Sequence, residues 1–328
     1  MIKALCIVVP IYNDWASMRV LLERLNAVAG TLETQFFIIA VDDGSTEEEQ
    51  GQLGEVGRLT SLRGVEVVHL ASNVGHQRAI AIGLCLAVER HGADAVLVMD
   101  GDGEDPPESI ATLLDRAAGL KDFCIVAQRR KRTEKTGFKV SYLLYKVVFR
   151  FLTGKQISFG NFSLTSRDYA RRLVMIAELW NNLPAAILRS RLPVHRVPID
   201  RGHRYAGVSK MNFVSLVVHG MSGISVYAET IFVRLLVVTI ILGVLTIASV
   251  TGLLFIRIFY PEHATPGWAT TISFGMIIIL MQVFFTALTS ILTLLNSRVQ
   301  RLVLPLVEYR HYIASIQLLA GEPLEPVV

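Results

Sequence analysis

The sequence predicts an α/β protein with a doubly wound, mostly parallel, Rossmann-like sheet, followed by amphipathic interface helices and two transmembrane helices. Short β-branched runs alternate with stretches of helical length between Leu5 and Ala127, and two long uncharged apolar runs follow. In addition, 52% of the 328 residues are hydrophobic and the mean hydropathy is +0.47. This composition is too apolar for a purely soluble protein.

The expected strands are five short runs rich in branched apolar residues, at 5–9, 36–41, 65–70, 95–99 and 123–127. The stretches of helical length between them lie at 14–29, 46–60, 76–91 and 107–118. In an open α/β sheet, ligands bind beyond the carboxyl ends of the strands. We therefore expect one crevice to gather the segments that follow four of these strands, 10–14, 42–45, 73–76 and 100–105.

Two segments are long and apolar enough to cross a bilayer. Residues 235–256 and 264–297 contain no charged side chain, and each exceeds the roughly 20 residues that a hydrocarbon core requires. Arg234, Arg298 and Arg301 flank their outer ends, so the positive-inside bias predicts that both termini are cytoplasmic. We expect an integral membrane protein, of the inner (plasma) membrane if the protein is bacterial.

These features divide the chain into four expected parts. They are a cytoplasmic domain over 1–211, a juxtamembrane amphipathic helix over 212–233, a two-helix transmembrane hairpin over 234–297 and a cytoplasmic C-terminal tail over 298–328. An amphipathic segment of the tail, 302–319, is expected to rest on the membrane. Small residues in the hairpin, such as Gly243 and Gly252, are compatible with helix association, with ordinary membrane-helix composition as the alternative, and we expect a homo-oligomer.

Apolar residues recur at helical spacing in two further segments, 140–151 and 213–231. This periodicity predicts amphipathic helices. Such helices either lie on the bilayer surface or pack against the sheet, and the same periodicity is expected in the two cases.

Four carboxylates follow the apolar run that ends at Met99, in the order Asp100-Gly101-Asp102-Gly103-Glu104-Asp105. Residues two apart in an extended chain project to the same side, so Asp100 and Asp102 can face one cation. Carboxylate oxygens suit Mg²⁺ or Mn²⁺, which keep open positions for phosphate oxygens. The pattern predicts a site for a metal and a diphosphate, with a solvated acidic turn as the alternative.

The net charge of +4 is unevenly distributed, because the segment 129–155 is strongly basic. This segment favours an anionic partner. No nucleic-acid recognition motif accompanies it, and the apolar runs favour an anionic lipid or a lipid phosphate. A solvated basic loop is the alternative.

Five motifs in this order resemble those of a known family: V-P-I-Y-N-D, V-D-D-G-S-T, N-V-G-H-Q-R-A-I, M-D-G-D-G-E-D-P-P-E and R-Y-A-G-V-S-K. Over residues 7–234 the chain resembles the family-2 inverting glycosyltransferases of GT-A fold. It is most similar to the polyprenyl-phosphate glycosyltransferases, the group of dolichyl-phosphate mannose synthase and bacterial undecaprenyl-phosphate glucosyl transferases. The resemblance implies a GT-A-type catalytic domain, a nucleotide-sugar donor, a polyprenyl-phosphate acceptor and Mg²⁺ or Mn²⁺ as cofactor.

The same resemblance assigns roles to individual residues. Those implied to bind the donor are Pro10, Tyr12, Asp14, Asp43, Gly75, His76 and Asp100. Those implied to hold the metal and the diphosphate are Asp100, Asp102 and Glu104. Those implied to act at the reacting centre or on the acceptor are Asp102, Arg129, Arg132, Asn161 and Lys210.

One departure from the family pattern bears on the mechanism. Relatives often carry an acid in a Gly-Asp-Phe-Arg segment, whereas this chain has Gly160-Asn161-Phe162-Ser163. Asn161 can hydrogen-bond a sugar but cannot act as a general base. A lipid-phosphate acceptor needs no base, because a phosphate monoester with a second pKa of about 6 is already mostly dianionic at neutral pH.

Other functions stay open at this point. Transfer to a hydroxyl of a glycolipid, glycan or protein would need a base, for which Asp105 and Asp168 are the available carboxylates. A non-catalytic scaffold is disfavoured by the intact Asp100 and Asp102. A channel or flippase is disfavoured because the apolar runs contain no ionisable residue.

Overall fold

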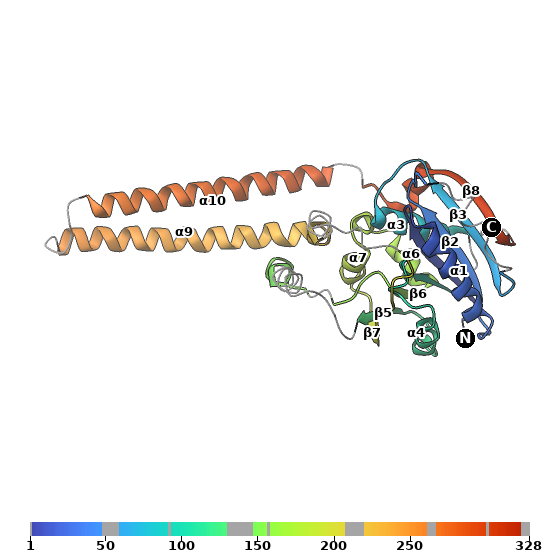
Figure 1. The fold of residues 1–328 in the computed structure, drawn as a ribbon. Coiled ribbons are helices and arrows are strands. Elements are labelled where there is room, and N and C mark those ends of the chain that lie inside the picture. Colours follow the sequence, from blue (N-terminus) through green and yellow to red (C-terminus); the bar gives the residue numbers. More distant parts are fainter. Residues whose placement is uncertain are drawn as a thin grey trace. The chain divides into compact units, whose positions relative to one another are not determined.

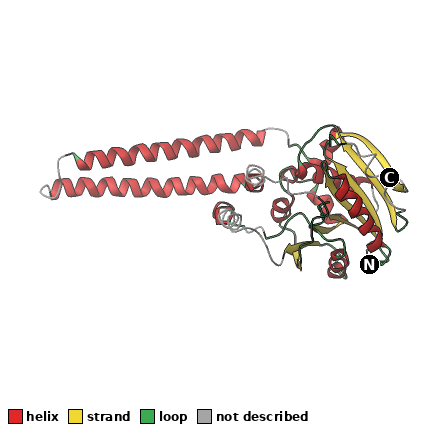
Figure 2. Ribbon diagram, viewed as in Figure 1, coloured by secondary structure: helices red, strands yellow, loops and turns green. Residues whose placement is uncertain are grey.

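The computed structural model describes residues 2–47, 59–90, 93–129, 147–155, 158–206, 220–260, 267–299 and 302–322. The chain divides into two compact units. We call Met1–Lys146, Gln156–Val226 and Leu302–Val328 the sheet unit, and Val147–Lys155 and Tyr227–Arg301 the helical unit. Figure 1 labels their elements, and Figure 2 distinguishes helices from strands.

Eight strands of the described chain form a single sheet. They are β1 (Ala4–Ile11), β2 (Gln35–Asp42), β3 (Leu62–Leu70), β4 (Ala95–Val98), β5 (Cys124–Arg129), β6 (Ser163–Ser166), β7 (His195–Ile199) and β8 (Ile313–Gly321). Their order across the sheet is β7-β5-β6-β4-β1-β2-β3-β8. Strands β4, β1, β2 and β3 are mutually parallel, whereas β6 and β8 are antiparallel to their neighbours. The mostly parallel α/β sheet predicted from the sequence is confirmed.

Helices cover both faces of the sheet. They are α1 (Trp15–Ala29), α3 (His76–Arg90), α4 (Ser109–Ala117), α6 (Arg167–Leu173), α7 (Leu183–Arg189) and α11 (Pro305–Glu308), with short 3-10 helices η1 (Ala177–Trp180) and η3 (Tyr309–Tyr312). Successive side chains of a strand point to opposite faces. Leu5, Ile7 and Val9 of β1 therefore pack with α1 and α4, whereas Cys6 and Val8 pack with α3, α6 and α7. Burial on both faces explains why the central strands are apolar throughout.

The pairing of β6 determines which residues reach the carboxyl edge of the parallel strands. Ser163 pairs with Val98 at the end of β4, and Ser166 pairs with Ala95 at its start. Asn161, just before β6, therefore lies at the edge where Asp100 follows β4. Asp168 follows β6 and lies at the opposite edge of the sheet, so it is not the base that a hydroxyl acceptor would need.

The C-terminal segment belongs to the sheet, a placement that the sequence analysis did not predict. Strand β8 pairs antiparallel with β3, from Gly64 opposite Gly321 to Leu70 opposite Ile313. Tyr309 is buried against α3, and the indole nitrogen of Trp180 donates to the carbonyl of Val303 at 2.9 Å. Strand β8 itself spans only 9 residues, and over so short a run hydrophobic periodicity alone does not separate a helix from a strand.

Glu89 of α3 links this C-terminal segment to the rest of the sheet unit. Its Oε2 accepts hydrogen bonds from the Tyr309 hydroxyl and from Arg310, both at 2.6 Å. Partial burial raises the pKa of Glu89, but these two hydrogen bonds outweigh it and lower the pKa below its usual value. The ionised carboxylate therefore stabilises the fold above the pKa of an unfolded glutamate, and this contribution is lost as the pH falls through the lowered pKa.

We expect Glu89→Gln to weaken the attachment of β8 by about 1 kcal/mol, because the charged acceptor of two hydrogen bonds becomes neutral. Hydrogen exchange at neutral pH should then be about fivefold faster at the amides of 313–321, a rate ratio that corresponds to this energy. Glu33→Gln, at an exposed position, is the matched control and should leave the exchange unchanged. Unaltered exchange in the Glu89 variant would contradict this role.

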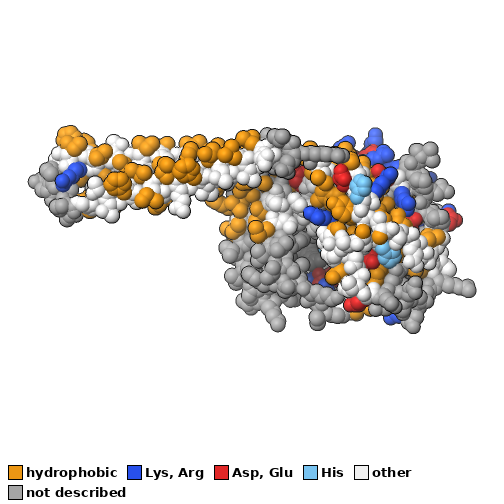
Figure 3. All heavy atoms as spheres, turned by 90° about the horizontal axis from the view of Figure 1, so that it is seen from above, with side chains coloured by type: hydrophobic (Ala, Val, Ile, Leu, Met, Phe, Trp, Pro, Cys, Tyr) orange, Lys and Arg blue, Asp and Glu red, His pale blue; other side chains and the backbone are white. Residues whose placement is uncertain are grey.

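The helical unit contains two long apolar helices, α9 (Ala228–Phe259) and α10 (Trp268–Val299). Both meet the length and hydropathy expected of a membrane span, over Ala228–Phe259 and Thr270–Asn296, and only 6% of each apolar window is buried. Exposed apolar side chains cover much of their surface in Figure 3. A buried core helix does not show this exposure, so α9 and α10 are candidate membrane spans, as the sequence predicts.

Several hydroxyl side chains within α9 and α10 are hydrogen-bonded inside their own helix. The hydroxyls that donate to the carbonyl oxygen four residues earlier, each at 2.8 Å, are those of Thr239, Thr251, Thr286, Thr289, Ser290 and Thr293. In lipid, an unpaired hydroxyl would cost free energy because no water is present. These residues are therefore compatible with a bilayer.

Three expected helices are only partly described. Residues 48–58 of the helix expected at 46–60 lie outside the described residues, as do 140–146 and 213–219 of the two amphipathic segments. The described part of the first amphipathic segment is helical, and Phe149 packs edge-on against Tyr227 with ring centroids 5.9 Å apart. In the second, a helical turn at 220–225 precedes α9.

Candidate active site

The loops after β1, β2, β4 and β7 and the segment before β6 meet at the carboxyl edge of the sheet. Tyr12 follows β1 and is 45% exposed, so its ring is available to a ligand, whereas Pro10 lies within β1 and is buried. Asp14 stands at the N-cap position of α1, but its side chain makes no capping hydrogen bond. The convergence expected from the sequence is thus present in the structure.

The two aspartates at the end of β2, Asp42 within the strand and Asp43 just after it, are buried and bond different loops. Asp43 accepts hydrogen bonds from the backbone N–H groups of Val74 and Gly75, at 2.7 and 3.0 Å. Asp42 accepts from the Ser45 N–H at 2.9 Å and lies 3.0 Å from Nδ1 of His69. Burial raises the pKa of Asp43, although the two backbone hydrogen bonds oppose that shift. Asp43 therefore fixes the turn that leads into α3.

The acidic loop, residues 100–105, is held by its own carboxylates. Asp105 is buried and accepts the N–H of Asp100 at 3.0 Å, and Asp102 accepts the N–H of Glu104 at 2.9 Å. Gly103 has a φ of 91°, a left-handed conformation that favours glycine. Asp105 thus closes the loop by accepting the N–H of its first residue.

A second loop, residues 200–206 after β7, packs against the acidic loop, and we call it the arginine loop. The N–H groups of Gly202 and Tyr205 donate to the carbonyls of Glu104 and Asp102, both at 2.9 Å. A Cβ on Gly103 would lie 2.6 Å from the carbonyl oxygen of His203, so this approach requires glycine.

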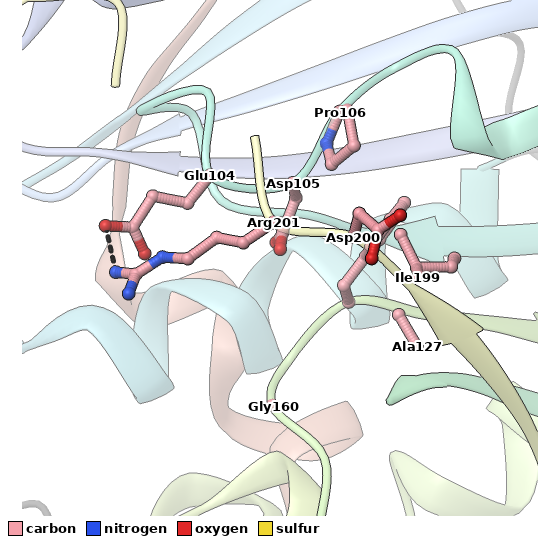
Figure 4. A pocket seen from close by; sticks show the side chains of 9 residues that line it. Glu104, Asp105, Pro106, Ala127, Gly160, Ile199, Asp200 and Arg201 are labelled. Carbon is pink, nitrogen blue, oxygen red and sulfur yellow. Dashed lines mark hydrogen bonds and ion pairs between the residues drawn. The ribbon is translucent and has the colours of Figure 1, made fainter. Parts of the chain in front are cut away.

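Two arginines of this loop pair with the predicted metal ligands. Arg204 contacts Asp102 at 2.5 Å, and Arg201 forms an ion pair with Glu104. Figure 4 shows Arg201 reaching Glu104 at the rim of a small pocket that Asp105, Pro106, Gly160 and Asp200 also line. The acidic loop therefore already holds cationic groups.

The charges of the acidic loop are crowded. Burial and the neighbouring charges of Asp100 and Glu104 raise the pKa of Asp102, while the Glu104 N–H and Arg204 lower it. Such crowding favours a bound cation. Within the described residues, however, no three metal-binding side chains form a ready-made group. The carboxylate donor set suits Mg²⁺ or Mn²⁺, and two of its three members are currently paired with guanidinium groups.

Asn161 lies between the acidic loop and the start of α3. Its Nδ2 is 3.4 Å from Oδ1 of Asp100 and 3.0 Å from Nε2 of His76. His76 Nε2 is itself 3.2 Å from the same Asp100 oxygen. Asp100, His76 and Asn161 therefore form a second cluster beside the pair of Asp102 and Glu104.

Some predicted site residues are not placed. Arg132 and Lys210 lie outside the described residues, and only the backbone of Arg129, at the end of β5, is described. The sequence analysis did not identify Arg201, Arg204 or Gln77 as site residues, and Gln77 donates a hydrogen bond to Asn161. Arg204 is the first residue of the motif R-Y-A-G-V-S-K, so its position in that motif could have indicated a role. Gln77 also lies in a motif noted in the sequence, N-V-G-H-Q-R-A-I, but the motif does not reveal its contacts, which join segments far apart in the chain.

The sequence is similar to that of known glycosyltransferases. The sequence profile described as glycosyl transferase family 2 matches residues 6–175. An uncharacterised glycosyltransferase of Synechocystis sp. is 30% identical over 223 residues, which cover 67% of this chain and 68% of that protein. The undecaprenyl-phosphate 4-deoxy-4-formamido-L-arabinose transferase of Pectobacterium carotovorum is 30% identical over 220 residues, 66% of this chain and 65% of that protein. Its counterpart in Proteus mirabilis is 27% identical, and the chain again spans just under two thirds of it, 65%.

Among solved structures, mannosyl-3-phosphoglycerate synthase of Rubrobacter xylanophilus has a similar fold, with a TM-score of 0.50 and 15% sequence identity. The similarity covers 70% of this chain and 73% of that structure. It concerns the fold alone. Since the family profile spans more than half of the sequence and a relative of 30% identity extends over two thirds of it, the chain belongs to glycosyl transferase family 2.

Proposed function

We propose that this glycosyltransferase moves a sugar from a nucleotide-sugar to a membrane polyprenyl phosphate, with inversion at the anomeric carbon. One observation carries the proposal: a chain with the acidic site of this family also has two exposed apolar helices of membrane-spanning length. A water-soluble acceptor gives no reason for such helices, whereas a lipid phosphate is found only at a membrane. The names of the relatives from Proteus and Pectobacterium, which state undecaprenyl phosphate, support this acceptor.

The donor binds along the loops after β1, β2 and β4. Tyr12 packs beside the base, and Asp43, with Gly75 and His76, shapes the nucleoside end of the site. Asp100, Asp102 and Glu104 would hold Mg²⁺ or Mn²⁺, and the ion supplies positive charge to the departing diphosphate when it is bound. The arginine loop adds positive charge at the same place, because Arg201 and Arg204 already lie against two of these carboxylates.

The acceptor attacks without a protein base. A phosphate monoester is dianionic at neutral pH, and Asn161, at the position where relatives often have an acid, cannot accept a proton. Arg129, Arg132 and Lys210 hold the acceptor phosphate against repulsion from the diphosphate. Transfer to a hydroxyl would need a base, and of the two candidate carboxylates Asp168 lies at the other edge of the sheet, while Asp105 is buried and accepts the Asp100 N–H.

The membrane arrangement follows from the flanking charges. Arg234, Arg298 and Arg301 support a cytoplasmic position for the outer ends of α9 and α10, for the catalytic sheet unit and for both termini. Oligomerisation through the small residues of these helices completes the proposal.

The test is a donor screen with the purified full-length protein. UDP-glucose, UDP-galactose, UDP-N-acetylglucosamine and GDP-mannose are each supplied with Mg²⁺ or Mn²⁺ and a short polyprenyl phosphate, and the lipid product is analysed by mass. The expected product is a polyprenyl monophosphate carrying one sugar, labile to mild acid. Transfer only to hydroxyl groups of added glycolipid would overturn the proposal.

A further inference from the structure

Gln77, the second residue of α3, is a buried amide with both ends hydrogen-bonded. Its Oε1 accepts the backbone N–H of Leu183 at 2.7 Å, and its Nε2 donates to Oδ1 of Asn161 at 3.1 Å. Only 9% of Gln77 is exposed. It contacts none of the predicted metal ligands in these hydrogen bonds, and the proposed reaction gives it no chemical role.

The bond to Leu183 is anchored by the fold. Leu183 is the first residue of α7 and is buried, and the first N–H groups of a helix have no partner inside the helix. Asn182 caps this helix by accepting the N–H of Ala185 at 3.0 Å. The N–H of Leu183 takes its acceptor from Gln77, since water does not reach this position.

The direction of each hydrogen bond then determines the next. A backbone N–H can only donate, so the oxygen of Gln77 must face Leu183 and its NH₂ group must face Asn161. The oxygen of Asn161 must in turn face Gln77. The NH₂ group of Asn161 is therefore directed towards Asp100 Oδ1, at 3.4 Å, and His76 Nε2, at 3.0 Å.

We propose that Gln77 is a positioning residue that fixes the side-chain amide of Asn161 with its NH₂ group towards Asp100. This assignment rests on the proposed function for its catalytic consequence. A donor on Oδ1 of Asp100 orients this carboxylate, which would take part in holding the metal. An oxygen of Asn161 in the same place would repel Asp100.

The variant Gln77→Glu keeps the hydrogen bond from Leu183 and reverses the direction of the hydrogen bond to Asn161. One oxygen of the introduced carboxylate still accepts the Leu183 N–H, but the other can no longer donate, so Asn161 turns its NH₂ group to that carboxylate and its oxygen to Asp100. At pH 8, with the donor and polyprenyl phosphate that give product in the screen, we expect kcat to fall at least tenfold. The matched control is Gln35→Glu, an exposed glutamine at the start of β2, which should retain full kcat.

A double-mutant cycle separates positioning from a general loss of structure. In an Asn161→Ala background, Gln77→Glu should change kcat less than twofold, because the group through which Gln77 acts is gone. Gln77→Met, which neither donates nor accepts, repeats the test should the glutamate variant fold poorly. An equal fold-loss of kcat in both backgrounds would overturn the assignment.

Thermal unfolding without ligand tests the hydrogen bond from Gln77 to Asn161, which we call the relay, independently of any sugar transfer. The four proteins are the wild type, Gln77→Glu, Asn161→Ala and the variant with both changes. The apparent Tm shifts of Gln77→Glu and Asn161→Ala should be non-additive, because the two side chains interact directly. Additive shifts contradict the relay whatever the enzyme transfers. A wild-type protein that makes no polyprenyl product, together with non-additive shifts, contradicts the proposed acceptor and leaves the relay intact.

Discussion

Replacing Asp102 by asparagine is expected to lower sugar transfer about 1,000-fold, the scale seen when one electrostatic contact to developing charge is removed. The amide retains an oxygen that accepts the Glu104 N–H, so the acidic loop keeps its local structure. It loses the charge that would bind the metal and that pairs with Arg204. The measurement is the initial rate of lipid-linked product at saturating donor.

Asp115→Asn is the matched control, because Asp115 lies exposed on α4. It should retain the wild-type rate, and both variants should elute from size-exclusion chromatography as the wild-type protein does. If Asp102→Asn transferred sugar at the wild-type rate, the acidic loop would have no part in catalysis.

Replacing Arg204 by glutamine is expected to lower kcat/KM about 100-fold, since a guanidinium that stabilises developing negative charge is typically worth this much or more. In the structure Arg204 neutralises Asp102 and lies 4.0 Å from Glu104. Asp102 and Glu104 would hold a metal ion, and Arg204 would then be able to contact the diphosphate. Arg204→Lys should recover only part of the loss, because a lysine lacks the planar fork.

Arg196→Gln, an exposed arginine on β7, controls for the loss of one positive charge and should leave kcat/KM unchanged. A further readout is Mn²⁺ affinity measured by electron paramagnetic resonance. Metal binding in the Arg204 variant should strengthen if the guanidinium competes with the ion. Unchanged affinity together with unchanged kcat/KM would remove Arg204 from the site.

Local patterns were sufficient for the central sheet and for the acidic loop. β-Branched runs identified β1 to β5, and because parallel strands share one carboxyl edge, Asp43, His76 and Asp100 could be expected to meet there. The two apolar helices were equally visible, since length and hydropathy are local properties.

Long-range pairings were not visible in the same way. Strand β6 has four residues, and only its antiparallel register places Asn161 beside Asp100. Strand β8 pairs with β3 across most of the chain, and the sequence pattern of 302–319 fits other structures equally well. The arginine loop and Gln77 depend on hydrogen bonds between distant segments, which no sequence period encodes.

The mass of the lipid product tests the central claim most directly. Purified protein, nucleotide-sugar, divalent metal and a polyprenyl phosphate should give one new lipid whose mass equals the polyprenyl phosphate plus one sugar residue, with the nucleoside diphosphate released in equal amount. Nucleoside diphosphate released without any glycosylated polyprenyl phosphate, or sugar found only on hydroxyl groups, would contradict it.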